Sequence, residues 1–413
     1  MWLFEELKGA MGMTTETIQP LLDASDRMVE ATPSAFHRYL FDMIDWRDRL
    51  ICIEGARGTG KSTIMRQRMK EGLPAGCKAV YMSFDDLWFA GNPFVDAVQW
   101  LYSHGYTHLF MDEVHQMPDW SFRIKNVNDQ YPSLSIVYSG SSILRLSKSK
   151  GDLSRRQAVY GLKGLSFREY LSLEGLYHGE KIPLGEILAD HRKIAAEIVR
   201  KVKVLAHFET YLKTGYYPFY SEAFALYGQR IIAAINKTLE SDWPFVADVS
   251  PATIRKTKKM LMSLAASAPQ LPNMAKLYRE LETERNTGLK MLEALEKGAL
   301  LSLVSSSSDK LKNLSRPEKI YCDNTNLMFA LTPQAEKGTV RETFFLNQLG
   351  VGHDVTYPAK GDFLVDGKHL FEVGGSGKRF TQIKDMPDSY VAADDIELGI
   401  GNKIPLWLFG FLY

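Results

Sequence analysis

The feature that most constrains how this 413-residue chain can fold is a glycine-rich run at residues 55–63, Gly-Ala-Arg-Gly-Thr-Gly-Lys-Ser-Thr. The run follows an apolar, strand-like segment at residues 50–54 and leads into a helix-like segment that begins at Lys61. A glycine-rich turn between a strand and a helix lets successive backbone N–H groups converge on one anion, and the helix N-terminus adds partial positive charge. The run therefore predicts a phosphate-binding loop.

Each residue type in this loop has an expected role. Gly55 and Gly60 permit the tight turn. Lys61 is expected to reach the β- and γ-phosphates, and the Ser62 hydroxyl is expected to ligate Mg²⁺. ATP and Mg²⁺ are therefore the predicted ligands. The residues expected to contact the nucleotide are Gly55, Ala56, Arg57, Gly58, Thr59, Gly60, Lys61, Ser62 and Thr63.

Composition places the chain among globular proteins. Apolar residues make up 45% and charged residues 24% of it. The net charge of +1 does not indicate binding to nucleic acid or membrane. Cys52, Cys77 and Cys322 are widely separated, which predicts reduced thiols and neither a metal site nor a disulfide framework. Because no apolar run approaches the ~18–20 residues that cross a bilayer and the N-terminus lacks a signal-peptide layout, we expect a cytoplasmic protein with no membrane partner.

Strand-like and helix-like segments alternate between residues 49 and 148. Strands are predicted at residues 49–54, 78–84, 107–111 and 134–139, with helices between them such as residues 94–104. The strand segments are almost continuously apolar, as expected for strands covered on both faces. The alternation predicts an α/β fold in which a P-loop NTPase parallel sheet carries helices on both faces.

The segments on either side of this region have helical patterning. Apolar residues recur at helical spacing in residues 1–48 and again from about residue 150 to 250. Within the second segment, the clearest helices are predicted at residues 192–212 and 229–239.

The strand at residues 109–113 carries the second part of the predicted nucleotide site. Its apolar residues bury the strand and place Asp112 at the C-terminal end, where parallel sheets bind ligands. Asp112 is expected to hold Mg²⁺, directly or through water, and Glu113 to orient or deprotonate the attacking water. The next strand ends at Ser139, which is expected to sense the γ-phosphate or help to place the water. Ser141 is the second choice, and an ordinary polar strand end is the alternative.

Four segments together resemble the AAA-type ATPase domain of a prokaryotic family whose members carry a C-terminal nuclease-like domain of unknown function. They are residues 55–63, 109–113, 139–142 and 153–171, the last of which ends in Leu-Ser-Phe-Arg-Glu-Tyr-Leu. The resemblance extends over nearly the whole chain and keeps the motifs in order.

The resemblance also suggests an arginine finger. A Gly-Arg pair commonly precedes the Leu-Ser-Phe-x-Glu-Tyr-Leu run in that family, and this chain has Ser-Arg-Arg there instead. It implies that Arg155 or Arg156 contributes positive charge to the transition state, the alternative being a surface pair with no catalytic role. If that arginine comes from a neighbouring chain, turnover would need a homo-oligomer or a protein partner. We identify no second-sensor arginine in the helical lid.

The pattern and the resemblance together predict five parts. These are an N-terminal helical lead-in (1–48), an AAA-type P-loop core (49–172), a helical lid (173–250), a winged-helix-like module (251–320) and a small α+β nuclease-like domain (321–413).

The fourth part has the layout of a winged helix and a local basic excess. Two short helices are predicted at residues 273–282 and 286–297, followed by a hairpin with strands at residues 298–304 and 320–322. Residues 251–320 carry 13 Lys/Arg and 7 Asp/Glu, a net of +6. This excess favours DNA contact through phosphates, with Lys256, Lys258 and Lys259 as candidates, although winged helices also serve as protein contacts.

The fifth part resembles the PD-(D/E)xK nuclease fold with a departure from its motif. Two alternating segments flank Asp366-Gly367, which predicts a hairpin. The matching positions are Glu342, Asp362 and Glu372, and the resemblance implies that they would hold Mg²⁺ or a similar ion. The lysine expected two residues after Glu372 is replaced by Gly374. Lys378 is the candidate substitute, and Gln382 follows it on a predicted helix.

These patterns support three functional hypotheses. The first is an AAA-type ATPase that couples ATP binding and hydrolysis to conformational change or assembly, on DNA in one version. The second is a nucleotide-regulated switch whose C-terminal parts bind proteins and whose nuclease-like domain is inactive. The third is an ATP-gated nuclease.

Overall fold

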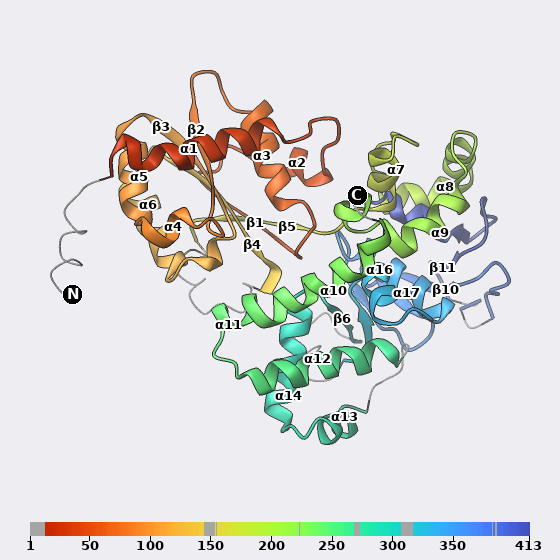
Figure 1. The fold of residues 1–413 in the computed structure, drawn as a ribbon. Coiled ribbons are helices and arrows are strands. Elements are labelled where there is room, and N and C mark those ends of the chain that lie inside the picture. Colours follow the sequence, from red (N-terminus) through yellow and green to blue (C-terminus); the bar gives the residue numbers. More distant parts are fainter. Residues whose placement is uncertain are drawn as a thin grey trace. The chain divides into compact units, whose positions relative to one another are not determined.

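The computed structural model describes residues 13–143, 153, 155–222, 224–267, 273–306, 317–381, 383–384 and 386–413. The chain divides into two compact units, whose elements are drawn in Figure 1. The first unit extends to Leu162 and includes residues Phe245–Ala247, and the second comprises residues Lys163–Pro244 and Asp248–Tyr413. The finer division into five parts stays a prediction.

A five-stranded parallel sheet forms the centre of the first unit, which confirms the predicted α/β fold. Its strand order is β2-β3-β4-β1-β5, and every neighbouring pair is parallel. The strands are β1 (Leu50–Gly55), β2 (Lys78–Ser83), β3 (Tyr106–Asp112), β4 (Ser135–Ser141) and β5 (Ala158–Leu162). Parallel neighbours need crossover connections, so helices alternate with the first four strands along the chain.

The edge strand β5 corrects the expectation that the chain turns helical from about residue 150. It pairs with β1 in parallel, with Ile51 opposite Ala158 and Gly55 opposite Leu162. Only Leu162 of this strand is fully buried, and Val159 is 46% exposed. The strand therefore lacks the continuous apolar run that identified the four buried strands.

The helices of the first unit lie around this sheet (Figure 1). They are α1 (Thr15–Glu30), α2 (Tyr39–Met43), α3 (Lys61–Glu71), α4 (Trp88–Gly91), α5 (Phe94–Ser103), α6 (Trp120–Gln130) and a 3₁₀ turn, η3 (Val114–Gln116). In the part of the chain that the structure describes, no helix has the length and apolar character needed to cross a membrane.

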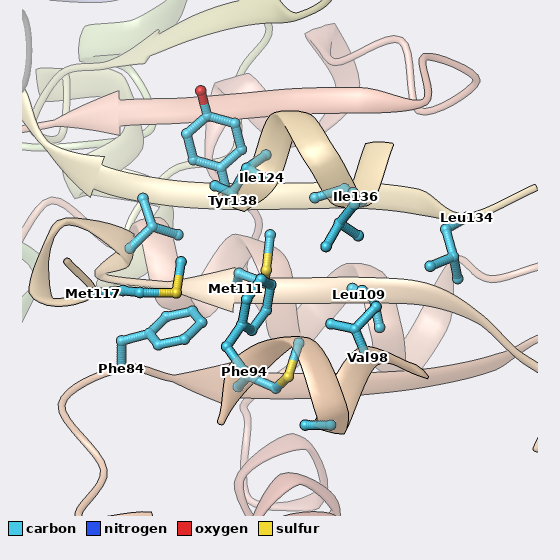
Figure 2. Packing of buried hydrophobic residues seen from close by; sticks show 14 of the residues in the cluster. Phe84, Phe94, Val98, Leu109, Met111, Met117, Ile124, Leu134, Ile136 and Tyr138 are labelled. Atoms are coloured by element: carbon cyan, nitrogen blue, oxygen red, sulfur yellow. The ribbon is translucent and has the colours of Figure 1, made fainter. Parts of the chain in front are cut away.

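The sheet is buried on both faces because successive side chains of a strand point to opposite sides. On one face, Met111 of β3 packs in a cluster with Phe94 of α5 and Ile124 of α6 (Figure 2). On the other face, the neighbouring Phe110 packs in a second cluster with Ile64 of α3. Each of these side chains is at most 4% exposed, and full burial of such a side chain stabilises the fold by about 1.5–3 kcal/mol. This two-sided burial is why the central strands are nearly continuously apolar.

The second unit is helical in its first half. Its helices up to residue 297 are α7 (Phe167–Leu173), α8 (Leu184–Val199), α9 (Val204–Thr214), α10 (Tyr227–Lys237), α11 (Trp243–Val246, whose last residues belong to the first unit), α12 (Pro251–Ala266), α13 (Met274–Glu280) and α14 (Arg285–Lys297). Shorter turns are η6 (Pro218–Ser221), η7 (Phe224–Leu226) and the π-helical η8 (Thr238–Asp242).

The single helix predicted at residues 192–212 is wrong, because the chain breaks between α8 and α9. The connection has the sequence Arg-Lys-Val-Lys at residues 200–203. Val202 is buried there, and Lys203 leaves the helical region with φ −74° and ψ 75° before α9 begins. No glycine or proline marks the break, and the segments on both sides have helical periodicity. The sequence pattern therefore predicted one continuous helix.

A two-stranded antiparallel sheet follows α14 and leads to the C-terminal sheet. It pairs β6 (Leu301–Val304) with β7 (Lys319–Cys322). Helices α16 (Thr325–Leu331) and α17 (Lys337–Leu349) come next. Helices α13 and α14 and the β6–β7 pair lie where two helices and a hairpin are predicted, and α12 precedes them. The winged-helix assignment stays a prediction.

The C-terminal sheet is mixed, with strand order β12-β11-β10-β9-β8. Its strands are β8 (Val355–Thr356), β9 (Phe363–Val365), β10 (His369–Gly374), β11 (Ser389–Ala393) and β12 (Lys403–Pro405), followed by the 3₁₀ helix η9 (Leu406–Phe411). β9 and β10 form the predicted hairpin around Asp366 and Gly367, both with positive φ. β8 pairs with β9 antiparallel, whereas β11 is parallel to both β10 and β12. Phe345 of α17 packs against Phe363, Phe371 and Phe409 in the core beside this sheet.

Ser166 ties the start of α7 to the end of the chain. Its hydroxyl accepts from the Glu169 N–H at 3.1 Å and donates to the Tyr413 carbonyl at 2.8 Å. The Glu169 carboxylate in turn accepts from the Ser166 N–H at 3.1 Å, which completes a capping box. Because Ser166 is fully buried, none of these polar groups can readily exchange its partner for water.

We therefore predict that Ser166→Ala lowers the free energy of unfolding by about 1–3 kcal/mol, since it removes a helix cap and two buried hydrogen bonds of the Ser166 hydroxyl. Calorimetric unfolding of the full chain measures the shift. Ser263→Ala on the exposed face of α12 is the control and should change stability by less than about 0.5 kcal/mol. Equal effects of the two substitutions would contradict the prediction.

Candidate nucleotide site

The glycine-rich loop at residues 55–63 joins β1 to α3, as its sequence predicts. Gly58 and Gly60 have φ of 79° and 98°, a region that side-chain-bearing residues rarely adopt. A Cβ on Gly55 would lie 2.3 Å from the backbone carbonyl oxygen of Leu162 in β5. The loop therefore needs glycine for two different reasons: backbone conformation at two positions and close strand packing at the third.

Lys61 is the first residue of α3 and is only 4% exposed. Its Nζ donates to the carbonyl oxygens of Gly55 at 3.0 Å and Ala56 at 2.9 Å. The ammonium thus lies inside the loop that is expected to surround the phosphates. A lysine Nζ is a compact three-hydrogen donor, so it can exchange carbonyl for phosphate oxygens with a small movement of its stem.

Asp112 ends β3 with its carboxylate buried between the neighbouring strands. The hydroxyl of Tyr81 in β2 donates to Oδ2, and the hydroxyl of Ser139 in β4 donates to Oδ1. Burial, reinforced by the Asp112 carboxylate, raises the pKa of the Tyr81 hydroxyl far above its usual value. Tyr81 therefore keeps its proton and donates a hydrogen bond to the carboxylate that is expected to hold Mg²⁺.

Glu113 follows Asp112 in a left-handed conformation, with φ 54° and ψ 42°. Its N–H donates to the Ser139 hydroxyl at 3.2 Å, so Ser139 bonds both acidic residues. Its carboxylate pairs with Arg57 of the loop at 3.2 Å and lies 3.4 Å from Nε2 of His115. The Glu113 side chain is 12% exposed, so the pair with Arg57 is largely shielded from water.

Three of these contacts were not predicted from the sequence. Arg57 was expected only as one of the loop residues around the nucleotide, and neither Tyr81 nor His115 was singled out. Tyr81 is an aromatic residue in a buried strand, a position that usually indicates core packing alone. The signal that could have found it is its place in β2, next to the strand that carries Asp112.

The remaining predicted residues of this site lie in different surroundings. Ser141 is buried, and its hydroxyl has no hydrogen-bond partner among the described residues. Arg156 pairs with Asp129 of α6, with Nε 3.0 Å from Oδ1 and both side chains partly exposed. Arg155 is exposed. An arginine-finger role for either arginine stays a prediction.

The carboxylates of the nuclease-like resemblance lie beside lysines. Nζ of Lys319, a residue that no sequence pattern singled out, is 3.2 Å from Glu342 Oε2 and 3.8 Å from Asp362 Oδ1. Nζ of Lys378 is 3.3 Å from Glu372 Oε2. The structure thus brings Glu342 and Asp362 together around one ammonium group and places Glu372 against another.

A metal-binding role for these carboxylates stays a prediction. Within the described residues, no three histidine, cysteine, aspartate or glutamate side chains come close enough together to hold a metal ion. Gln382, expected on a helix after Lys378, lies outside the described residues.

The lysines proposed for DNA contact are engaged within the protein to different degrees. Lys256 Nζ donates to the Glu282 carbonyl, and Lys258 Nζ pairs with Glu240. Lys259 is exposed on α12, as is Arg255. Of the basic residues on this helix, Arg255 and Lys259 therefore present the more accessible charges.

Two family models match separate parts of the chain. Residues 47–171 match an AAA domain, and residues 205–337 match a domain of unknown function, DUF8612. The first match includes the loop, Asp112, Glu113 and Ser139, and it supports a nucleotide-binding domain of the AAA type in this part of the chain.

Similar proteins are distant in sequence. An uncharacterized protein of Methanocaldococcus jannaschii is 26% identical over 298 residues, which are 66% of this chain and 60% of that protein. The match thus spans less than two thirds of the relative's length. Orc1 of Aeropyrum pernix in complex with DNA is 12% identical, covering 77% of this chain and 92% of that one, with a TM-score of 0.29. DnaA of Aquifex aeolicus bound to AMPPCP is 13% identical, covering 70% and 89%, with a TM-score of 0.24.

The hydrogen bond that Tyr81 donates to Asp112 leads to a prediction. Removing its hydroxyl in Tyr81→Phe should leave the core packed but weaken the orientation of Asp112, an expected metal ligand. Loss of such a supporting contact typically costs about 10–100-fold in metal affinity. Titrating Mg²⁺ into protein with a fluorescent ATP analogue measures the effect, and Tyr102→Phe on the exposed side of α5 is the control. An unchanged Mg²⁺ dependence in Tyr81→Phe would show that its hydroxyl has no such role.

Proposed function

We propose that the first unit is a Mg²⁺-dependent ATPase that couples ATP binding and hydrolysis to a change in conformation or assembly. The observation that carries this proposal is the arrangement of Lys61, Asp112, Glu113 and Ser139 at the C-terminal ends of β1, β3 and β4. Ligands bind at this edge of a parallel sheet. The match of residues 47–171 to an AAA domain supports the same proposal.

Ser62 and Asp112 would hold the magnesium ion. Both offer oxygen ligands, which Mg²⁺ prefers, and the Tyr81 hydroxyl donates a hydrogen bond to the Asp112 carboxylate. When bound, Mg²⁺ would neutralise negative charge on the phosphates. The two side chains fit this ion by the chemistry of their oxygen atoms.

Lys61 and the loop N–H groups would bind the phosphates, and Glu113 would act on the attacking water. A carboxylate that accepts a proton must be free to approach that water. Glu113 is instead paired with Arg57 in this structure. We infer that phosphate oxygens compete for the Arg57 guanidinium when ATP binds, which releases the Glu113 carboxylate. Ser139 hydrogen-bonds the Glu113 N–H and the Asp112 carboxylate, so it would hold the two acidic residues in a fixed position relative to each other.

Two substitutions separate binding from turnover. Glu113→Gln should retain ATP binding and lower turnover by about 10²–10⁴-fold, the usual contribution of a general base. Lys61→Ala should weaken ATP binding itself, because the ammonium is lost from the phosphate loop. Phosphate release and nucleotide titration measure the two effects.

Glu16→Gln is the matched control, because Glu16 is an exposed glutamate in the first turn of α1. It should leave both binding and turnover unchanged. If Glu113→Gln hydrolyses ATP at the wild-type rate while Lys61→Ala does not, the role given to Glu113 in activating water is wrong.

We further propose that α12 contacts nucleic acid, the alternative being a protein partner. The exposed Arg255 and Lys259 supply the accessible part of the local basic excess. The double variant Arg255→Glu/Lys259→Glu should reduce the slope of log affinity against log salt by about two, since each phosphate contact contributes nearly one unit.

Filter binding to duplex DNA across a range of salt concentrations measures this slope. Lys276→Glu/Lys290→Glu, on α13 and α14, is a charge-matched control elsewhere in the same module. If the wild-type chain shows no salt-dependent DNA affinity, a protein partner becomes the better explanation for this module.

A further inference from the structure

Lys319 is the first residue of strand β7, and its side chain is only 14% exposed. The ammonium is 3.2 Å from Glu342 Oε2 and 3.8 Å from Asp362 Oδ1. Two aromatic rings also lie near it, with Nζ 5.2 Å from the ring centre of Tyr357 and 5.9 Å from that of Phe363. Carboxylates and ring faces are both favourable surroundings for a cation.

The same two carboxylates have further donors. The Tyr321 hydroxyl donates to Glu342 Oε2 at 2.6 Å, and the Val373 N–H donates to Asp362 Oδ2 at 2.8 Å. These neutral donors orient the oxygens without cancelling their charge. Lys319 supplies the positive charge that compensates this pair of acids.

Glu372 has a lysine of its own. It is 1% exposed, and Lys378 Nζ lies 3.3 Å from its Oε2. A Cβ on Gly374 would lie 2.9 Å from carbon atoms of the Lys378 side chain. Lys378 therefore occupies the space that a side chain at position 374 would need. Each of the three carboxylates therefore faces an ammonium group of the chain itself.

We propose that Lys319 is a built-in cation that takes the place of a divalent metal ion between Glu342 and Asp362. The C-terminal part of the chain would then not cleave phosphodiesters with the help of a metal ion. This agrees with the second functional hypothesis, in which the nuclease-like domain is inactive. Burial raises the pKa of Glu342 and the Asp362 charge adds to this, while Lys319 and Tyr321 oppose the shift. The ammonium thus favours the ionised form of an acid that would otherwise tend to take up a proton.

The test is whether removing Lys319 creates a metal site. Every protein compared carries Asp112→Asn, which removes the other expected metal ligand, and the chain with this change alone is the reference. Lys319→Met keeps much of the stem and leaves two facing carboxylates, which should then bind Mn²⁺. We expect millimolar Mn²⁺ to raise the melting temperature of nucleotide-free Lys319→Met by at least about 3 °C, and that of the reference chain by less than about 1 °C.

Further variants make the result specific. Lys319→Met/Glu342→Gln should lose the rise in melting temperature with Mn²⁺. Lys378→Met should not gain Mn²⁺ binding between Glu342 and Asp362. If Lys319→Met does not fold, Lys319→Gln replaces it, and the reference chain alone still provides a decisive measurement.

The proposal is overturned if the reference chain binds Mn²⁺ and Asp362→Asn abolishes that binding. It is also overturned if folded Lys319→Met or Lys319→Gln gains no response, or if the wild-type chain cleaves DNA or RNA in a way that Asp362→Ala abolishes.

Discussion

The hydrogen bonds that Tyr81 and Ser139 donate to Asp112 join the ends of three neighbouring strands, β2, β3 and β4. They fix the position of a buried carboxylate, and Ser139 also accepts the N–H of Glu113. A buried polar group is tolerated only when it is well hydrogen-bonded, so these contacts are a condition for having Asp112 at this position. The rest of the nucleotide site is arranged around this fixed point.

The two-sided core explains why that point is rigid. Helices cover both faces of the sheet, and Met111 and Phe110, immediately before Asp112, pack on opposite sides of it. Displacing Asp112 would therefore disturb both clusters. Glu113, by contrast, leaves the strand in a left-handed conformation and pairs with Arg57, the contact that we propose phosphate oxygens displace. In that proposal Asp112 is the fixed acid of the site and Glu113 is the acid that moves.

Much of the first unit could be predicted from the sequence because its signals are local. The four predicted strands lie within two residues of their observed positions, since continuous apolar runs reflect burial on both faces. The break between α8 and α9 was missed because residues 200–203 contain no glycine or proline. Tyr81 and Lys319 were missed for a different reason: their roles depend on neighbours from other elements, which no local pattern reveals. Lys319 lies on β7, Glu342 on α17 and Asp362 just before β9, so their contact joins three elements that are apart in the sequence.

We propose above that the site around Asp112 hydrolyses ATP. The most direct test of this hydrolysis is phosphate release by the wild-type chain and by Asp112→Asn, each with Mg²⁺ and with excess chelator. We predict phosphate release by the wild type that requires Mg²⁺ and falls to the background rate in Asp112→Asn. ATP binding by the wild type without phosphate release above the Asp112→Asn rate, at any protein concentration, would contradict the claim.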